Sequence, residues 1–286
     1  MPRLLVRSRA DRRRALTDRV LRGFCLAAAV VAIIPLFAVI GFVVVNGAAG
    51  LSIDLLTKPP RALGTGGGAV GAILGSLQMV SVATVLAVPV GILAAVYVAE
   101  FGGRRSATIV RFAADVLVGI PSILMGIFVF TFLVLPFRQF NAFAGSVALA
   151  LLMIPVVMRT TEEIVRLVPV SLREASLALG VPAWRTVLSI VLRTGLGGIL
   201  TGVMLAVARA AGETAPLLFT ALGSRLVNVG DFGKPMDALP IFIFVNARQP
   251  YPVLNKQAWG AALLLLAFVL VINILVRARS VGRRTR

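Results

Sequence analysis

Long apolar runs alternate with short charged stretches along the chain. Six runs with few ionisable side chains predict membrane-spanning helices over residues 24–45, 69–98, 112–135, 144–158, 187–212 and 258–276. Most of them are long enough to cross a ~30 Å hydrocarbon core at a helical rise of ~1.5 Å per residue. The pattern therefore predicts an all-α, polytopic membrane domain over residues 24–276, with basic tails at residues 1–23 and 277–286.

The composition supports a membrane protein and argues against an enzyme. The 286 residues are 59% hydrophobic and 14% charged, with a mean hydropathy of +0.98, and a soluble domain carries more charge than this. The chain has no His, and its single Cys25 lies in the first apolar run, so the commonest base and metal ligand is missing. It also lacks a G-x-x-x-x-G-K-[ST] loop for ATP. We expect no catalytic residue, no metal and no cofactor on this chain.

The net charge of +18 is explained by the sidedness of a membrane protein rather than by nucleic acid. Six spans place both termini on one side, together with the turns that hold most of the remaining Arg residues. Lys and Arg are enriched on the cytoplasmic side of membrane proteins. We therefore expect a multi-pass protein of the cytoplasmic (inner) membrane with both termini inside and no nucleic-acid partner. The outer segments hold only Lys58, Arg61, Arg138, Arg225, Lys234, Arg248 and Lys256.

A charged stretch between the fourth and fifth apolar runs is predicted to form a short amphipathic helix over residues 171–182. Gly180 is a helix stop signal, and Pro182 favours the start of the next element. The predicted sidedness places this helix on the cytoplasmic face. There Glu174 offers a carboxylate, and the small side chain of Ala175 allows the close approach of a soluble partner.

This stretch resembles the coupling loop of ABC-importer permeases. The pattern of that loop is E-A-A, three residues, G, nine residues and I-x-L-P, and Glu174-Ala175-Ser176, Gly180, Ile190 and Leu192 fit it. Ser176 replaces the second Ala, and Arg193 replaces the final Pro. The resemblance implies that Glu174, Ala175, Ser176 and Gly180 contact an ATPase subunit.

An ion pair interrupts the fifth apolar run, in the string A-R-A-A-G-E-T-A-P. The i,i+4 spacing of Arg209 and Glu213 places both side chains on one face of a helix. A guanidinium suits an oxyanion because it is permanently charged and donates bidentate hydrogen bonds. Glu213 can hold Arg209 or accept a proton from hydrogen phosphate, and Thr214 adds a hydroxyl. Two alternatives stay open, a structural pair that locks helices and a pair at the outer interface in water.

The same string is similar to that of the PstA family of phosphate-importer permeases. The motifs G-A-I-L-G-S at 71–76, V-P-V-G-I at 88–92 and G-I-P-S at 119–122 follow the order of that family, and the similarity covers about residues 68–275. It implies the type I ABC-importer permease fold, inorganic phosphate as substrate, and a phosphate path lined by Arg209 and Glu213. It also implies a PstC-like second permease, a PstB-like ATPase dimer that binds the ATP, and a PstS-like extracytoplasmic binding protein.

Two other functions are compatible with parts of the pattern. The same fold could carry another substrate, such as sulfate, molybdate or an amino acid. An intramembrane enzyme is much less favoured, because it needs a nucleophile with a base, or metal ligands, at membrane depth. For the remaining charges, we expect Glu162 and Glu163 to lie on a solvated loop after the fourth span, and Asp115 to be structural, near Arg111.

Overall fold

The computed structural model describes residues 9–62 and 64–281, and the chain divides into two units, residues 1–46 and 47–286. The described part of the first unit is helix α1 (Arg9–Gly50), which runs on into the second unit. The described part of the predicted N-terminal tail is therefore helical, while residues 1–8 and 282–286 of the two predicted tails lie outside the described residues. Apolar side chains of α1, such as Phe24 and Phe37, are exposed, as suits a helix in lipid.

The described part of the second unit is formed by helices and loops. Its helices are α2 (Ile53–Thr57), α3 (Val70–Val96), α4 (Arg104–Gly119), α5 (Ser122–Val129), α6 (Ala142–Leu167), α7 (Val170–Ala178), α8 (Ala183–Thr186), α9 (Leu192–Ala211), α10 (Ala215–Thr220), α11 (Leu239–Ala247) and α12 (Pro252–Val281). The π-helical segments η1 (Tyr97–Phe101) and η2 (Phe130–Val134) continue α3 and α5, and η3 (Val187–Val191) joins α8 to α9.

Five continuous helical stretches among the described residues are long and apolar enough to cross a membrane. They are Arg13–Gly50, Val70–Phe101, Ala142–Leu167, Ala183–Ala211 and Pro252–Ile274. A sixth candidate is the bent pair formed by Arg104–Gly119 and Ser122–Val134. Each of the six predicted spans thus has a helical counterpart, and the predicted all-α class is confirmed, although several bounds differ from those expected.

The third predicted span, residues 112–135, is not one straight helix. α4 ends at Gly119, α5 begins at Ser122, and the two axes differ by 101°. Ile120 has an extended backbone with φ −71° and ψ 128°, and Pro121 follows with φ −54° and ψ 133°. A proline disfavours the helical conformation of the residue before it and has no N–H to donate. Pro121 therefore turns the chain instead of merely kinking a helix.

The helix that contains the fourth predicted span, residues 144–158, is longer than that span. α6 continues to Leu167, so Glu162 and Glu163 lie on this helix, and the expected solvated loop at these residues is wrong. Glu162 is only 3% exposed, whereas Glu163 is exposed. The hydropathy pattern ended the helix at its first charged residues, but Arg side chains neutralise Glu162 inside the bundle.

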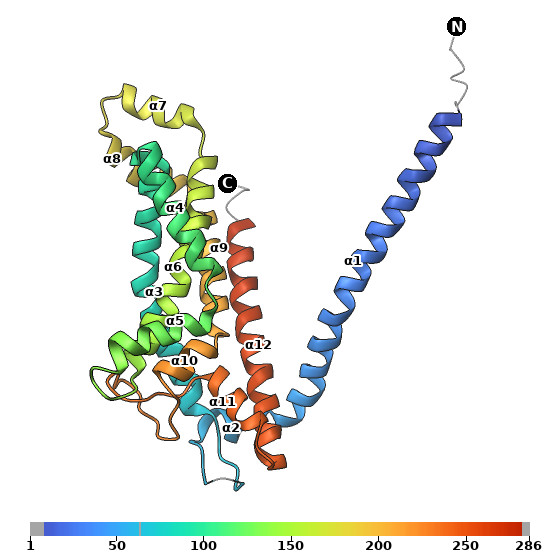
Figure 1. Cartoon of the computed structure of the whole chain (residues 1–286), viewed down its shortest axis with the longest axis vertical. Coiled ribbons are helices and arrows are strands. Elements are labelled where there is room, and N and C mark those ends of the chain that lie inside the picture. The colour runs from blue at the N-terminus through green and yellow to red at the C-terminus, as the bar shows by residue number, and fades with distance from the viewer. Residues whose placement is uncertain (1–8, 63, 282–286) are drawn as a thin grey trace. The chain divides into compact units, whose positions relative to one another are not determined.

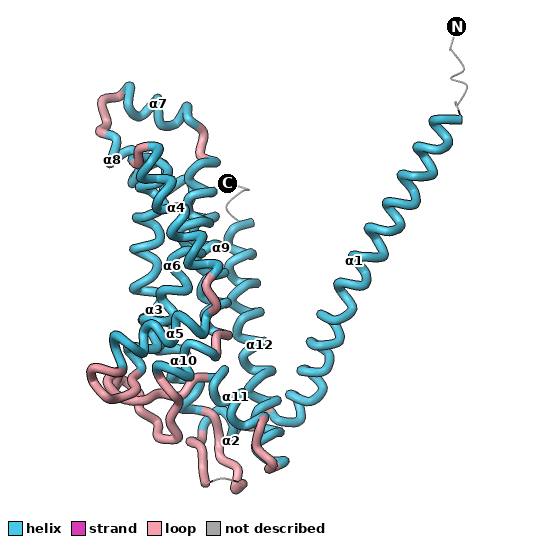
Figure 2. The backbone as a smooth tube through the Cα atoms, viewed as in Figure 1, coloured by secondary structure: helices cyan, strands magenta, loops and turns pink. Residues whose placement is uncertain are grey.

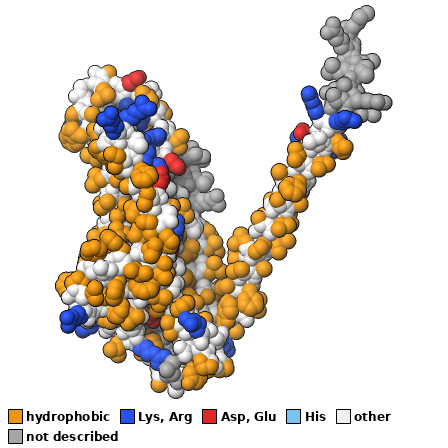
Figure 3. All heavy atoms as spheres, in the orientation of Figure 1, with side chains coloured by type: hydrophobic (Ala, Val, Ile, Leu, Met, Phe, Trp, Pro, Cys, Tyr) orange, Lys and Arg blue, Asp and Glu red, His pale blue; other side chains and the backbone are white. Residues whose placement is uncertain are grey.

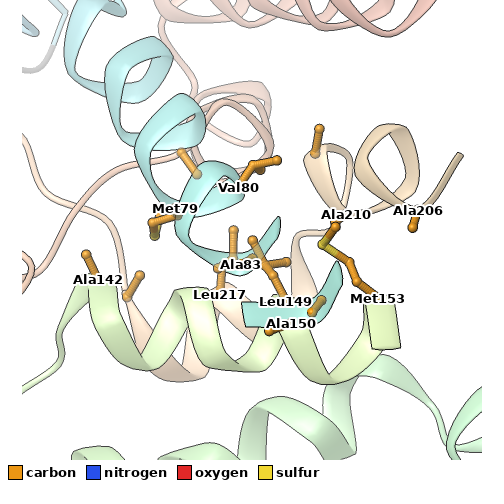
Figure 4. Close-up of a cluster of buried hydrophobic side chains, with 14 of the residues drawn as sticks. Met79, Val80, Ala83, Ala142, Leu149, Ala150, Met153, Ala206, Ala210 and Leu217 are labelled. Carbon is orange, nitrogen blue, oxygen red and sulfur yellow. The ribbon is translucent and has the colours of Figure 1, made fainter. Parts of the chain in front are cut away.

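The core of the second unit lies where α3, α6 and α9 pack together (Figure 4). Met79 and Ala83 of α3 face Leu149 and Met153 of α6, and α9 contributes Ala206 and Ala210. Small residues let these helices approach closely, as is common in membrane proteins. A Cβ atom at Gly91 would lie only 2.8 Å from Val157 Cγ1, so α3 and α6 need a glycine at this crossing.

The second unit has two contrasting ends (Figures 1 and 2). α7 and α8 lie at one end, whereas α2, α11 and most of the loops lie at the other. Figure 3 shows Lys and Arg at both ends and mainly apolar side chains between them. This distribution is that of a protein whose middle lies in hydrocarbon and whose ends lie in water.

Candidate functional site

Arg209 and Glu213 lie where α9 ends. The Arg209 Nε atom is 3.9 Å from Glu213 Oε1, which is too long for a direct hydrogen bond. The Arg209 side chain is 58% exposed, and that of Glu213 is 20% exposed. Within residues 9–62 and 64–281, the Arg209 guanidinium makes no hydrogen bond. The pair is therefore loose, and the donors of Arg209 are available to an anion.

The chain turns sharply directly after Arg209. α9 ends at Ala211, Gly212 follows as its C-cap, and the Glu213 N–H donates to the Ala210 carbonyl over 3.2 Å. Thr214 then precedes α10, which has Pro216 in its first turn. A proline is tolerated there because the first helical N–H groups have no partner within the helix. Thr214, which is half-buried, therefore follows the ion pair directly in the chain and precedes α10.

The predicted coupling helix is present as α7, which covers Val170–Ala178 rather than residues 171–182. The Gly180 N–H donates to the Leu177 carbonyl over 2.9 Å, and the Val181 N–H donates to the Ser176 carbonyl over 3.2 Å. Gly180 has φ +77°, in the left-handed region. These features form a Schellman motif, in which glycine is favoured because it has no Cβ atom. The glycine of the coupling pattern therefore serves to end this helix.

The four predicted coupling residues do not all face outward. Glu174, Ala175 and Gly180 are exposed, but Ser176 is only 3% exposed. The Ser176 Oγ atom lies 2.8 Å from Thr186 Oγ1, in a hydrogen bond between α7 and α8. Ser176 therefore holds the coupling segment together, and its side chain is not part of the exposed surface.

Arg173, which the sequence did not single out as a site residue, fixes α7 to the rest of the bundle. Its Nη2 atom is 2.6 Å from Glu100 Oε1, and its Nε atom is 3.1 Å from the same oxygen. It also donates to the carbonyl oxygens of Val165, over 2.8 Å, and Val168, over 2.6 Å. One side chain thus joins α7, η1 and the end of α6. Nothing in the sequence around Arg173 indicates its contact with Glu100.

A second cluster of charges lies around Glu162. The Glu162 Oε1 atom is 2.6 Å from Arg111 Nε and 2.7 Å from Arg166 Nη2, and Arg159 Nη1 lies 3.6 Å from Oε2. Asp115, which we expected to be structural and near Arg111, pairs with Arg159. The spacing of Arg159, Glu162 and Arg166 on one helix face could have indicated part of this network. The contact with Arg111 could not be read from spacing.

The two predicted sites are separate but lie on connected elements. Ala183–Ala211 forms one helical stretch that starts just after the Gly180 turn and ends two residues beyond Arg209. At ~1.5 Å per residue this stretch is about 40 Å long. One run of helix, with the π-helical η3 inside it, therefore connects the segment after α7 to Arg209.

Comparisons with known proteins place the chain in a family. The family described as "Binding-protein-dependent transport system inner membrane component" matches residues 87–280. A phosphate transport system permease protein PstA from Yersinia pestis is 46% identical over 239 residues, covering 82% of this chain and 80% of the relative. The chain belongs to the PstA family of binding-protein-dependent permeases.

Other PstA proteins agree over a still larger part of the chain. The protein of Haemophilus influenzae is 40% identical over 261 residues and covers 91% of this chain, with 92% of its own length matched. PstA 1 of Mycobacterium tuberculosis is 40% identical over 270 residues, covering 92% of this chain and 87% of its own length. As a member of this family, the chain is a multi-pass membrane permease subunit.

A solved structure supports the fold of this PstA family member. A chain of the inward-facing MetNI methionine ABC transporter superposes with a TM-score of 0.60 at 18% identity. The match covers 74% of this chain and 94% of the other. The type I ABC-importer permease fold, with its short helix between membrane spans, is thereby confirmed.

Proposed function

We propose that this chain is the transmembrane subunit of an ATP-driven importer of inorganic phosphate. Family membership supports a permease, and the names of the relatives support phosphate as the substrate. The structural observation that carries the proposal is the continuous helical stretch from Ala183 to Ala211, which links an exposed coupling helix to an available arginine. A coupled transporter needs a continuous connection between the surface that contacts its ATPase and the group that binds its substrate.

The exposed face of α7 is the proposed docking surface for an ATPase subunit of the PstB type, which would bind the ATP. Glu174 and Ala175 are exposed there, next to the large apolar side chains of Leu172 and Leu177. An apolar patch with a carboxylate at its edge suits a protein partner. The motion of the ATPases would press on α7 and pass through the Ser176–Thr186 hydrogen bond to α8.

Arg209 is the proposed phosphate contact, with Glu213 and Thr214 beside it. Because the Arg209–Glu213 pair is loose, an oxyanion can bind the guanidinium without first breaking a strong internal hydrogen bond. Glu213 can accept a hydrogen bond from the hydroxyl of a hydrogen phosphate, and Thr214 can donate one through its own hydroxyl. Since Arg209 is exposed on this chain, the path would be completed by a second permease of the PstC type.

We infer that the protein lies in the inner membrane with both ends in the cytoplasm. The spans would be α1, α3, the bent α4–α5 pair, α6, α8–α9 and α12, with α7 on the cytoplasmic side. The end formed by α2 and α11 would face outward and receive phosphate from a PstS-like binding protein. Accessibility of cysteines introduced at Leu179 and Leu226 tests this orientation, because only the Leu226 position should react with an impermeant reagent in whole cells.

The decisive experiment is uptake of radiolabelled phosphate by a strain that lacks its own PstA and retains the other transporter subunits. The chain should restore uptake, and a strain with an inactive ATPase should show none. Glu174→Arg should abolish co-purification with the ATPase, while Glu163→Arg, which changes an exposed carboxylate on α6, serves as the matched control. Uptake of sulfate or molybdate instead of phosphate would refute phosphate as the substrate but would not contradict the permease fold.

A further inference from the structure

A pocket of about 210 Å³ lies at the end of the second unit away from α7. It is bounded by Pro60, Arg61 and Gly66 before α3, by the turn after α10, and by the helices α11 and α12. This volume is far above the space that one water needs and below the ~300–1,000 Å³ of pockets for drug-sized ligands. The pocket can therefore hold a small ion together with a few waters.

Two buried polar side chains line this pocket. Asp237 is 8% exposed and Asn246 is 6% exposed. The Asp237 Oδ1 atom accepts a hydrogen bond from the Ala238 N–H over 2.9 Å. In the described part of the chain, the Asp237 carboxyl has no other hydrogen bond, and the Asn246 amide has none. Among the described residues, the fully enclosed side-chain atoms without a hydrogen-bond partner are Thr161 Oγ1 and Glu162 Oε2. The unpaired atoms of Asp237 and Asn246 are not of this kind, and because both residues line the pocket they can bind a ligand or water there.

The walls of the pocket are held together by contacts between segments far apart in the sequence. Arg225 Nη1 donates to the carbonyl of Arg61 over 3.3 Å, and Gln257 Nε2 donates to the carbonyl of Gly67 over 2.7 Å. All four residues belong to or adjoin the pocket wall. The site is therefore preformed, which lowers the entropic cost of binding.

The charges at the pocket favour an anion that carries a proton. Arg61 and Arg225 are exposed and are the cationic residues of the lining, while Asp237 is its acidic one. Burial raises the pKa of Asp237 to about 7, so this carboxyl can donate a hydrogen bond when protonated and accept one when ionised. Hydrogen phosphate and hydrogen arsenate can form either bond near neutral pH. Sulfate has no proton there and can only accept.

We propose that this pocket is a second anion site, separate from Arg209, that binds a small protonated oxyanion such as hydrogen phosphate. Asp237 and Asn246 contact the ion, and Arg61 and Arg225 attract it. The role of the site as an entry point rests on the function proposed above, because that function assigns this end to the outer face. Binding itself is a property of the pocket and is tested without transport.

The test uses protection of a cysteine placed in the pocket wall. Val245 lines the pocket and is 41% exposed, so Val245→Cys in a Cys25→Ser background offers a thiol there. Val229→Cys, at a residue of the neighbouring loop that is 48% exposed and outside the lining, is the matched control. The purified transporter complex is treated with a neutral maleimide in the presence of inorganic phosphate or sulfate.

Phosphate should slow modification at position 245 and not at 229, and sulfate should protect neither. Asp237→Leu and Asn246→Leu should each raise the half-protecting phosphate concentration about tenfold, since each removes one strong hydrogen bond. No protection, equal protection by sulfate, or unchanged protection in both folded variants overturns the proposal. If phosphate does not protect Val245→Cys but the chain still supports phosphate uptake, only this second site is rejected. If phosphate protects Val245→Cys but the chain supports no uptake, only the proposed transport function is rejected.

Discussion

Removing Arg173 should release the coupling helix from the membrane bundle. The Arg173 side chain is 18% exposed and that of Glu100 is 14% exposed, so Arg173→Ala leaves a carboxylate largely buried without its partner. Breaking a buried ion pair by removing one member costs about 3 kcal/mol. Arg173→Ala also removes two hydrogen bonds to the carbonyl groups at the end of α6.

This cost should appear as local opening rather than as global unfolding. A change of about 3 kcal/mol raises the population of the detached α7 by roughly 100-fold. Hydrogen exchange of the amides in Val170–Ala178 should accelerate accordingly, while exchange in the α3–α6 core should not change. In the assembled transporter, ATP hydrolysis should continue with less phosphate moved per ATP.

Three further variants make the reasoning refutable. Arg173→Lys should recover part of the protection, because a lysine keeps the charge without the planar fork of donors. The exchanged pair Glu100→Arg with Arg173→Glu should recover less, since a glutamate cannot donate to the α6 carbonyls. Glu174→Gln, at the neighbouring exposed position, should leave exchange unaltered. If the amides of α7 exchange at the wild-type rate in Arg173→Ala, the Arg173 contacts do not hold this helix against the bundle.

Three other predictions concern the substrate path, the buried network and the outer pocket. Arg209→Ala should reduce phosphate uptake roughly 10- to 100-fold, as expected for the loss of charge-assisted hydrogen bonds, with subunit assembly unchanged on size-exclusion chromatography. Normal uptake by this variant would exclude Arg209 from the path. Glu162→Gln should lower the free energy of unfolding of the purified protein by about 3 kcal/mol, because three Arg side chains lose a buried counter-charge. Glu163→Gln, which changes an exposed carboxylate, should leave this free energy unchanged. Burial raises the pKa of Asp237 from 3.8 to about 7, so its stabilising contribution is full below pH 3.8 and is lost as the pH rises through 7. Asp237→Asn should therefore flatten the fall in melting temperature between about pH 4 and pH 7. An unchanged slope would contradict the raised pKa of Asp237.

Residues close in sequence were predicted well because helix geometry fixes their relation. The i,i+4 spacing of Arg209 and Glu213 was sufficient to place them together, and the positions of Gly180 and Pro182 correctly marked a turn after the coupling helix. The apolar runs located the candidate spans because burying side chains in hydrocarbon requires a long apolar stretch. The errors arose at Glu162, where a charged residue was taken as the end of a helix, and at Pro121, where a proline was placed inside one continuous span.

The sequence by itself determined the helices, the family and the local chemistry of the Arg209 segment. The tertiary structure alone decided which distant charges meet: Arg173 with Glu100, 73 positions apart, and Arg111 with Glu162, 51 positions apart. It also turned Ser176 inward and enclosed Asp237 and Asn246 in one pocket. The reason is physical, since spacing along one helix follows from its 3.6-residue period, whereas contacts between helices depend on crossing angles and register set by the packing of the whole bundle.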